Sequence, residues 1–246
     1  MAVSPHRQKY RARLAAGPSD LAACLALRAA VFRPQSGAAD DDAFDPICAH
    51  IMVEALEDRR LVCCFRYLIL KDGASLDHAY SAQFYELSAL EGFKGTMAEM
   101  GRFCIAPGAR DPDILRAAWG AMAEVVRENQ VDLLFGCSSF EGTDEAPYHD
   151  TFAMLRDRHI GPKRWLPRIK APRVFEFARR LGQTADPKAG LRMMPPLLKT
   201  YLAMGGWVSD HAVVDRDLGS LHVFTGVEVR RIPPARRRSI LAGLPG

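Results

Sequence analysis

EMGRFCIAP (residues 99–107), GARDPDILRAAWGAMAEVVRENQ (108–130) and VDLLFGCSSFEG (131–142) follow one another along the chain. The outer two segments are apolar runs of strand length, and the middle segment has apolar residues at helical spacing. Asp111 and Pro112 supply a typical helix start. The stretch therefore predicts a strand–helix–strand unit whose strands are parallel or splayed.

The first of these strands carries an acid and a base, Glu99 and Arg102. A desolvated charge without a partner costs several kcal/mol, so charges are rare on a strand that is otherwise apolar. The pair indicates a strand with a chemical role as well as a structural one.

Further elements are predicted on the N-terminal side of this unit. Residues 10–15 alternate as a strand, and Asp20 is expected to cap a helix over 21–32. Residues 50–56 and 61–70 read as two antiparallel strands.

The C-terminal side predicts a shorter set of elements. Residues 184–190 have the composition of a linker, and a helix is expected from Pro195-Pro196 to Gly205-Gly206. Apolar strands follow near 207–214 and 221–229. The whole pattern indicates an α+β fold with a central, mixed and mostly antiparallel sheet flanked by helices.

Three segments are expected from this order of elements. They are a core over residues 10–183, a C-terminal helix and strands over 190–232 that pack on the core, and a basic tail over 233–246.

Charges occur at two more positions that the pattern buries, Arg28 on the apolar stripe of the first helix and Arg66 inside a strand. Between them, the loop 33–46 contains the acidic run Asp40-Asp41-Asp42 and then Asp45. Acidic runs usually form solvated turns, and the run by itself predicts one.

Composition limits the class of protein. With 48% hydrophobic and 25% charged residues in 246, the chain can bury a full core. Its longest apolar run, 61–70, is interrupted by Arg66 and is shorter than the roughly 20 residues that span a bilayer. Residues 1–14 are basic but have no apolar signal region, so a cytoplasmic protein is expected. Six cysteines in apolar context are predicted to be buried, reduced thiols: Cys24, Cys48, Cys63, Cys64, Cys104 and Cys137.

The net charge of +4 is distributed unevenly. Residues 156–180 hold nine Lys and Arg against two acids, and five more arginines lie in 230–238. Such a segment attracts an acidic protein or an anionic membrane surface, and the alternative is a solvated basic face. Aromatic residues are not interleaved with the charges as a nucleic-acid platform requires, so no nucleic-acid partner is expected.

Several common catalytic motifs are absent from the sequence. Residues 136–140 lack the second glycine of a serine-hydrolase elbow, and no phosphate-binding glycine loop occurs. The histidines are isolated from other metal-ligand types, and we predict no metal site.

Three separated blocks resemble the L-ornithine Nα-acyltransferases, which belong to the GNAT-like acyltransferases. The blocks are EMGRFCIAP (99–107), GCSSFEGTD (136–144) and LKTYLAMGGWVSDHAVVDRDLGSLHVF (198–224), and the resemblance extends from about Leu14 to Phe224. It implies a GNAT-like fold and transfer of a 3-hydroxyacyl chain from acyl carrier protein to ornithine, with no permanently bound cofactor.

The resemblance also implies roles for particular residues. Glu99 would be the general base for the amine, with burial raising its pKa and Arg102 holding it ionised. Backbone N–H groups beside Cys104 would stabilise the oxyanion. Arg28 and Asp45 would line the acceptor pocket, in which an arginine binds the carboxylate and an aspartate binds the side-chain ammonium group. Further members of the substrate site would be Phe32, Arg66, Ser138 and Ser139. The alternative for the charged members is an internal ion-pair cluster that stabilises the N-terminal part.

The start of the central helix bears on the acyl donor. Relatives that use acetyl-CoA have a glycine-containing loop here, whose N–H groups bind pyrophosphate. This chain has Pro112, which lacks an N–H, between Asp111 and Asp113. The donor is therefore expected to be the acyl phosphopantetheine of an acyl carrier protein. Its acidic surface would contact Arg110, Lys163, Arg164, Arg168 and Lys170.

Two other functions fit parts of the pattern. An acyl-homoserine-lactone synthase shares the Arg28/Phe32, Asp45, Arg66 and Glu99–Phe103 arrangement but uses S-adenosylmethionine as the amine. The blocks at 136–144 and 198–224 favour ornithine instead. A membrane-active protein without catalytic activity is the second alternative, and the absence of an amphipathic membrane helix weighs against it.

Overall fold

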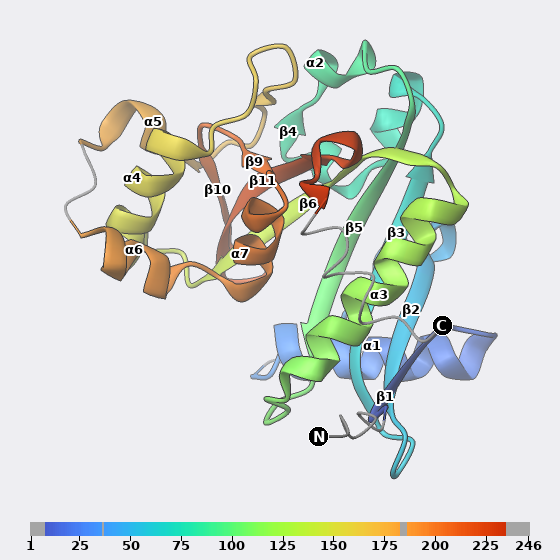
Figure 1. Cartoon of the computed structure of the whole chain (residues 1–246). Coiled ribbons are helices and arrows are strands. Elements are labelled where there is room, and N and C mark those ends of the chain that lie inside the picture. The colour runs from blue at the N-terminus through green and yellow to red at the C-terminus, as the bar shows by residue number, and fades with distance from the viewer. Residues whose placement is uncertain (1–7, 36, 183–185, 235–246) are drawn as a thin grey trace, which may run out of the picture. The chain divides into compact units, whose positions relative to one another are not determined.

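The computed structural model (Figure 1) describes residues 8–35, 37–182 and 186–234. The predicted basic tail lies outside the described residues from 235 onward. The described residues form two compact units: unit 1 holds residues 8–68 and 101–128, and unit 2 holds 69–100 and 129–234. Strands β3 (Leu61–Leu70) and β5 (Thr96–Ile105) each pass from one unit into the other.

Unit 1 is built on strands in the order β1 (Tyr10–Leu14), β2 (Ala49–Ala55), β3 and β5. The β1–β2 and β2–β3 pairs are antiparallel, as the sequence predicted for β2 and β3. Figure 1 shows helix α3 (Pro112–Glu128) along one face of these strands and helix α1 (Pro18–Phe32) across the other.

The core of unit 1 is rich in thiols. Cys24 of α1 packs with Met52, Cys64 and Cys104 of the strands. Cys64 Sγ lies 3.5 Å from Cys104 Sγ. Hydrogen bonding between thiols, followed by burial, raises the pKa of Cys24 and of Cys64. All six cysteines are free, four are buried and Cys48 and Cys137 are half-buried.

Unit 2 contains the first half of β5 and the strands that follow it in the chain. β5 pairs in parallel with β6 (Val131–Glu141), from Thr96 opposite Val131 to Glu99 opposite Phe135, which confirms the predicted strand–helix–strand order. The sheet continues through β11 (Ser220–Glu228) and β10 (Ala212–Asp215) to β8 (Val174–Phe175), and β9 (Trp207–Val208) also pairs with β11.

Close packing of two backbones explains why the block GCSSFEGTD (136–144) begins with glycine. A Cβ on Gly136 of β6 would lie 2.2 Å from the Met100 carbonyl oxygen of β5. Any larger residue would therefore push these two backbones apart at the end of their parallel pairing.

The remaining elements of unit 2 cover and extend this sheet. Its helices are α2 (Ser88–Glu91), α4 (His149–Arg158), α5 (Phe177–Arg180), α6 (Pro187–Met193) and α7 (Pro196–Ala203). A separate two-stranded sheet pairs β4 (Tyr85–Glu86) with β7 (Arg168–Ile169). One-turn 3₁₀ segments are η1 (Asp45–Ile47) in unit 1, and η2 (Gly73–His78), η3 (Tyr80–Gln83), η4 (Ala146–Tyr148) and η5 (Val229–Arg231) in unit 2.

Three of the predicted elements differ from the structure. The first helix begins at Pro18, because the Asp20 carboxylate accepts from Arg13 and from the Ala16 N–H instead of capping the helix. The predicted linker is wrong for residues 186–190, where Asp186 caps α6, and residues 184 and 185 are outside the described part. The run at 207–214 forms two short strands, β9 and β10.

No helix among the described residues is long and apolar enough to cross a membrane.

Candidate active site

Six charged side chains of unit 1 form a closed ring in which arginines and aspartates alternate. Arg28 bridges Asp45 and Asp40, Arg102 bridges Asp40 and Asp42, and Arg66 bridges Asp42 and Asp45. The members of this ion-pair ring are Arg28, Asp40, Arg102, Asp42, Arg66 and Asp45.

The ring is buried and its contacts are short. Arg28 Nη1 lies 2.6 Å from Asp45 Oδ1, and Arg66 Nη1 lies 2.6 Å from the same oxygen. The side chains of Arg28 and Arg66 are 1% and 2% exposed. Arg66 also lies over the Phe44 ring, 5.7 Å from its centroid. Three cations and three anions cancel, which lets the charges remain buried together.

The acidic loop is therefore not a solvated turn, and that prediction from the acidic run is wrong. Asp40 is 1% exposed and Asp45 is 6% exposed. Their partners come from α1, β3 and β5, which are far apart in sequence. The contacts match the internal ion-pair cluster that the sequence left as an alternative to an acceptor pocket. An acceptor carboxylate that used Arg28 would have to replace Asp40 or Asp45.

The ring changes the protonation of its aspartates. Burial by itself raises the pKa of Asp45, but hydrogen bonds from Arg28, the Asp42 N–H and Arg66 outweigh burial and lower the pKa to about 2. Burial raises the pKa of Asp42 as well, but the hydrogen bond from Arg66 and its charge outweigh burial, so the pKa of Asp42 is also lowered.

We expect unit 1 to lose stability in acid because of this shift. A carboxyl whose pKa falls from 3.8 to about 2 on folding stabilises the fold above the unfolded value, and this contribution is lost as the pH falls through that window. Urea unfolding at pH 7, 4 and 3 should show a declining free energy of unfolding. Asp45→Asn should be less stable at pH 7 and should flatten the decline between pH 4 and 3; an unchanged pH dependence would contradict the assignment.

Glu99 lies in unit 2 on β5, and η3 holds its carboxylate. Oε2 accepts from the Tyr80 N–H at 2.7 Å, and Oε1 accepts from the Ser81 N–H at 2.8 Å and from the Ser81 hydroxyl. Glu99 is 5% exposed, which confirms the predicted burial. Hydrogen bonds to a carboxylate favour its ionised form, which is the form that a general base needs.

Buried aromatic and imidazole side chains lie near η3 in unit 2. The Phe84 ring packs edge-on against His222, with centroids 4.9 Å apart, and the Tyr85 hydroxyl donates to the His222 carbonyl at 2.9 Å. Burial and the nearby His211 lower the pKa of His222 to about 3, so its imidazole is neutral at pH 7. Burial, followed by the nearby Cys137 and Glu99, raises the pKa of Tyr201. Of these groups, Tyr201 is close enough to Glu99 for the two to interact electrostatically.

The other predicted substrate residues lie in different surroundings. Phe32 packs on the thiol-rich core of unit 1. Ser138 is buried and its hydroxyl accepts from Thr225 at 3.0 Å, whereas Ser139 is exposed. Cys104 is 3% exposed within the same core as Phe32.

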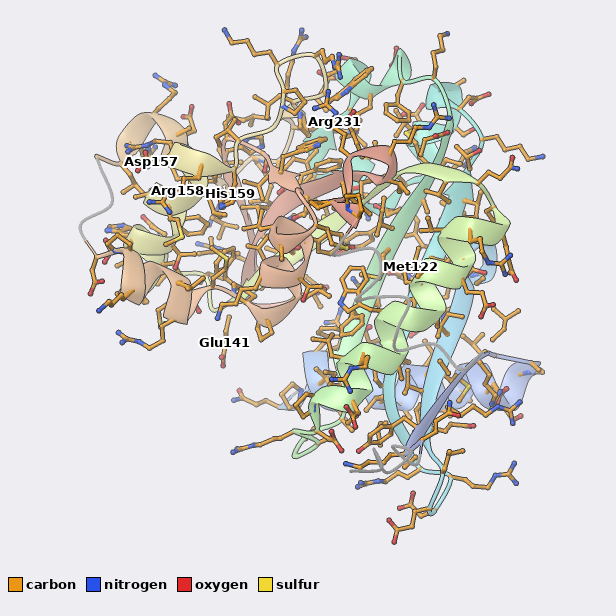
Figure 2. All side chains as sticks on the ribbon, viewed as in Figure 1. Met122, Glu141, Asp157, Arg158, His159 and Arg231 are labelled. Atoms are coloured by element: carbon orange, nitrogen blue, oxygen red, sulfur yellow. The ribbon has the colours of Figure 1, made fainter. Side chains whose placement is uncertain are left out.

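The basic residues predicted for the carrier protein lie at the surface. Lys163, Arg164 and Arg168 are exposed in unit 2, and Arg110 is exposed in unit 1. The Glu228 carboxylate lies 3.7 Å from Arg164 and 3.4 Å from Arg231, which is labelled in Figure 2. Lys170 is exposed as well, and its ammonium also donates to the Ala82 carbonyl at 2.7 Å.

Sequence reasoning missed the groups that hold Glu99. Tyr80 and Ser81 contribute backbone N–H groups, which any residue except proline supplies, so residue type gave no signal. The Ser81 hydroxyl, fully buried, could have been suspected only once the segment was known to contact β5.

The fold and the family comparison define the class of this protein. A family described as an acetyltransferase (GNAT) domain matches residues 27–120. FeeM, an N-acyl amino acid synthase from uncultured soil microbes, shares the fold with a TM-score of 0.53 over 91% of this chain and 94% of its own, at 15% identity. The fold is GNAT-like and the protein is an N-acyltransferase enzyme, as the sequence predicted.

Within this class, two curated relatives are similar along most of the chain. The L-ornithine N(alpha)-acyltransferase of Rhodobacter capsulatus is 29% identical over 96% of each chain. The enzyme of the same name from Brucella abortus is 28% identical over 89% of this chain and 84% of its own. The resemblance drawn from the three sequence blocks is confirmed.

Proposed function

We propose that this N-acyltransferase moves a 3-hydroxyacyl chain from acyl carrier protein to the α-amine of L-ornithine and so makes lyso-ornithine lipid. The observation that carries the proposal is the buried Glu99 carboxylate, whose two oxygens accept hydrogen bonds from the Tyr80 and Ser81 N–H groups. The relatives named L-ornithine N(alpha)-acyltransferase support ornithine as the acceptor.

Glu99 would remove a proton from the amine before or while the amine attacks the thioester. An α-amino group with a pKa near 8 is mostly protonated at pH 7 and has no lone pair for attack. Glu99 takes a proton from the amine, directly or through a water. The nitrogen then bonds to the thioester carbonyl carbon and gives up a second proton as the amide forms. The C–S bond breaks, and that second proton balances the one that the departing pantetheine sulfur takes up to leave as a thiol.

The oxyanion formed in this attack needs hydrogen-bond donors. Backbone N–H groups of β5 beside Cys104 are the proposed donors. The Cys104 thiol belongs to the core of unit 1 and has no assigned step in this scheme.

The start of α3 supports a carrier protein as the acyl donor. Pro112 has no N–H, the Asp113 N–H donates to the Asp111 carboxylate at 3.0 Å, and the Ile114 N–H donates to the Asp111 carbonyl at 3.1 Å. These two N–H groups at the start of α3 are therefore not available to a pyrophosphate. The carboxylates of Asp111 and Asp113 lie at the same place, where Lys9 pairs with Asp111 and Arg116 pairs with Asp113.

Charge reversal on the exposed basic face should weaken use of the carrier protein. Arg164→Glu combined with Arg168→Glu should raise the KM for acyl carrier protein about tenfold and leave kcat nearly unchanged, since rim charges mainly affect encounter. Steady-state rates at varied carrier concentration measure this. An unchanged KM would show that these side chains form a solvated face and do not contact the carrier protein.

The proposal is tested by one reaction with parallel arms. The purified protein is incubated with 3-hydroxyacyl carrier protein or 3-hydroxyacyl-CoA, and with ornithine or S-adenosylmethionine. We expect acylated ornithine from the carrier-protein arm. Acylation of S-adenosylmethionine alone, or equal use of CoA, would contradict the proposed acceptor or donor.

A further inference from the structure

The segment that holds Glu99 is itself held by the basic segment around β7. The contacts all lie within unit 2. β4, which follows η3 after Phe84, pairs with β7 through Tyr85 opposite Ile169 and Glu86 opposite Arg168. The Ala171 N–H extends this pairing by donating to the Phe84 carbonyl at 2.9 Å.

Lys170 adds a contact to η3 itself. Its ammonium donates to the Ala82 carbonyl at 2.7 Å. Carbonyl groups at the end of a helical turn lack partners within the turn, and a lysine ammonium is a suitable donor for them.

The N-terminal end of η3 binds a negative charge. Its first two N–H groups, of Tyr80 and Ser81, donate to the Glu99 carboxylate. The turn is therefore fixed between a carboxylate at its start and an ammonium at its end, which is the favourable orientation for the peptide dipoles.

The other contacts of this segment are apolar or neutral. Tyr85 is buried and bonded to His222, and Phe84 packs on the His222 ring. These contacts hold β4, whereas the Lys170 ammonium binds the Ala82 carbonyl of η3, so loss of this ammonium should loosen η3 while β4 stays in place.

We propose that Lys170 is a positioning residue, which acts through η3 to hold the Glu99 carboxylate in its reactive orientation. The inference rests on the proposed function in one respect, the role of Glu99 as base. It also gives two residues of the basic segment different roles. The Arg168 side chain is 78% exposed and accessible to a partner, whereas the Lys170 ammonium donates to η3, the turn that holds Glu99.

The test measures the hydrogen bonds from Tyr80 and Ser81 to Glu99 directly, and it needs no substrate. In Lys170→Met, hydrogen exchange at the Tyr80 and Ser81 amides should accelerate about tenfold relative to the unaltered protein, because their hydrogen bonds open more often. Exchange along β6 and β11 should not change. Lys188→Met, which removes an exposed lysine of α6, is the matched control.

Kinetics supply the second readout. Lys170→Met should lower kcat about tenfold with little change in the KM for carrier protein, and Lys170→Arg should restore most of the rate. Arg168→Met should change the KM and leave exchange at Tyr80 and Ser81 as it was.

Three results would overturn the proposal. Unchanged exchange at Tyr80 and Ser81 would show that Lys170 does not hold η3 in place. Faster exchange throughout unit 2 would show a general structural role, and a raised KM with unchanged kcat would make Lys170 a carrier contact. If the protein acylates neither ornithine nor S-adenosylmethionine, the proposed function fails, while the exchange data still decide the link from Lys170 to η3.

Discussion

Glu99→Gln is expected to lower the rate of acyl transfer by about 10²- to 10⁴-fold, the usual contribution of a positioned general base. The amide is close in shape to the carboxylate, but its NH₂ group cannot accept a proton. Steady-state kcat with carrier protein and ornithine at saturation measures the loss. The same variant should bind both substrates with little change, since the lost interaction belongs to the transition state.

The amide side chain in Glu99→Gln would also leave one η3 donor without an acceptor. Loss of one buried hydrogen-bond partner costs about 1–3 kcal/mol, so the variant should stay folded but melt earlier. Glu141→Gln is the matched control: Glu141 lies at the end of β6 and projects from the ribbon into open space in Figure 2. Near-normal turnover of folded Glu99→Gln would exclude Glu99 as the base.

Arg28→Met is expected to reduce the free energy of unfolding by about 3–5 kcal/mol, because removal of one partner from a buried ion-pair group leaves charge without compensation. Arg28 donates to Asp40 and, through two nitrogens, to Asp45. Urea unfolding at pH 7, followed by circular dichroism, measures the loss.

Two further variants separate the ring from ordinary surface pairs. Arg127→Met removes exposed pairs with Glu124 and Glu128 on α3 and should cost less than about 1 kcal/mol. Adding Asp45→Asn to Arg28→Met should recover part of the stability by removing the stranded anion. A loss of less than about 1 kcal/mol for Arg28→Met, with a large rise in the KM for ornithine, would instead favour an acceptor pocket.

The most regular parts of the fold could be predicted from local sequence. Helix α3 begins with Asp111-Pro112 and has a continuous apolar stripe, so its start and end follow from local signals. The same holds for α7, which begins beside Pro195 and ends before Gly205. The start of α6 was missed although Asp186-Pro187 is a similar signal, because the surrounding composition resembled a linker.

The candidate site could be predicted only in part, since it depends on contacts between distant segments. Burial of Arg28 and Arg66 followed from their apolar neighbours, but the pairing of both with Asp45 needs α1, η1 and β3 together. The acidic run looked solvated because its sequence gives no trace of the three arginines. For Glu99, residue type and strand context predicted a buried carboxylate on a strand, whereas its donors, backbone N–H groups of Tyr80 and Ser81, could not be predicted.

The central claim is that this enzyme acylates the α-nitrogen of ornithine from a carrier protein. The most direct measurement uses L-ornithine labelled with ¹⁵N at the α-position, 3-hydroxyacyl carrier protein and the purified protein, with fragmentation of the product by mass spectrometry. We predict a lyso-ornithine lipid with the label in the amide nitrogen, formed much more slowly from acyl-CoA. A product acylated on the side-chain nitrogen, or no acylated ornithine, would contradict the account.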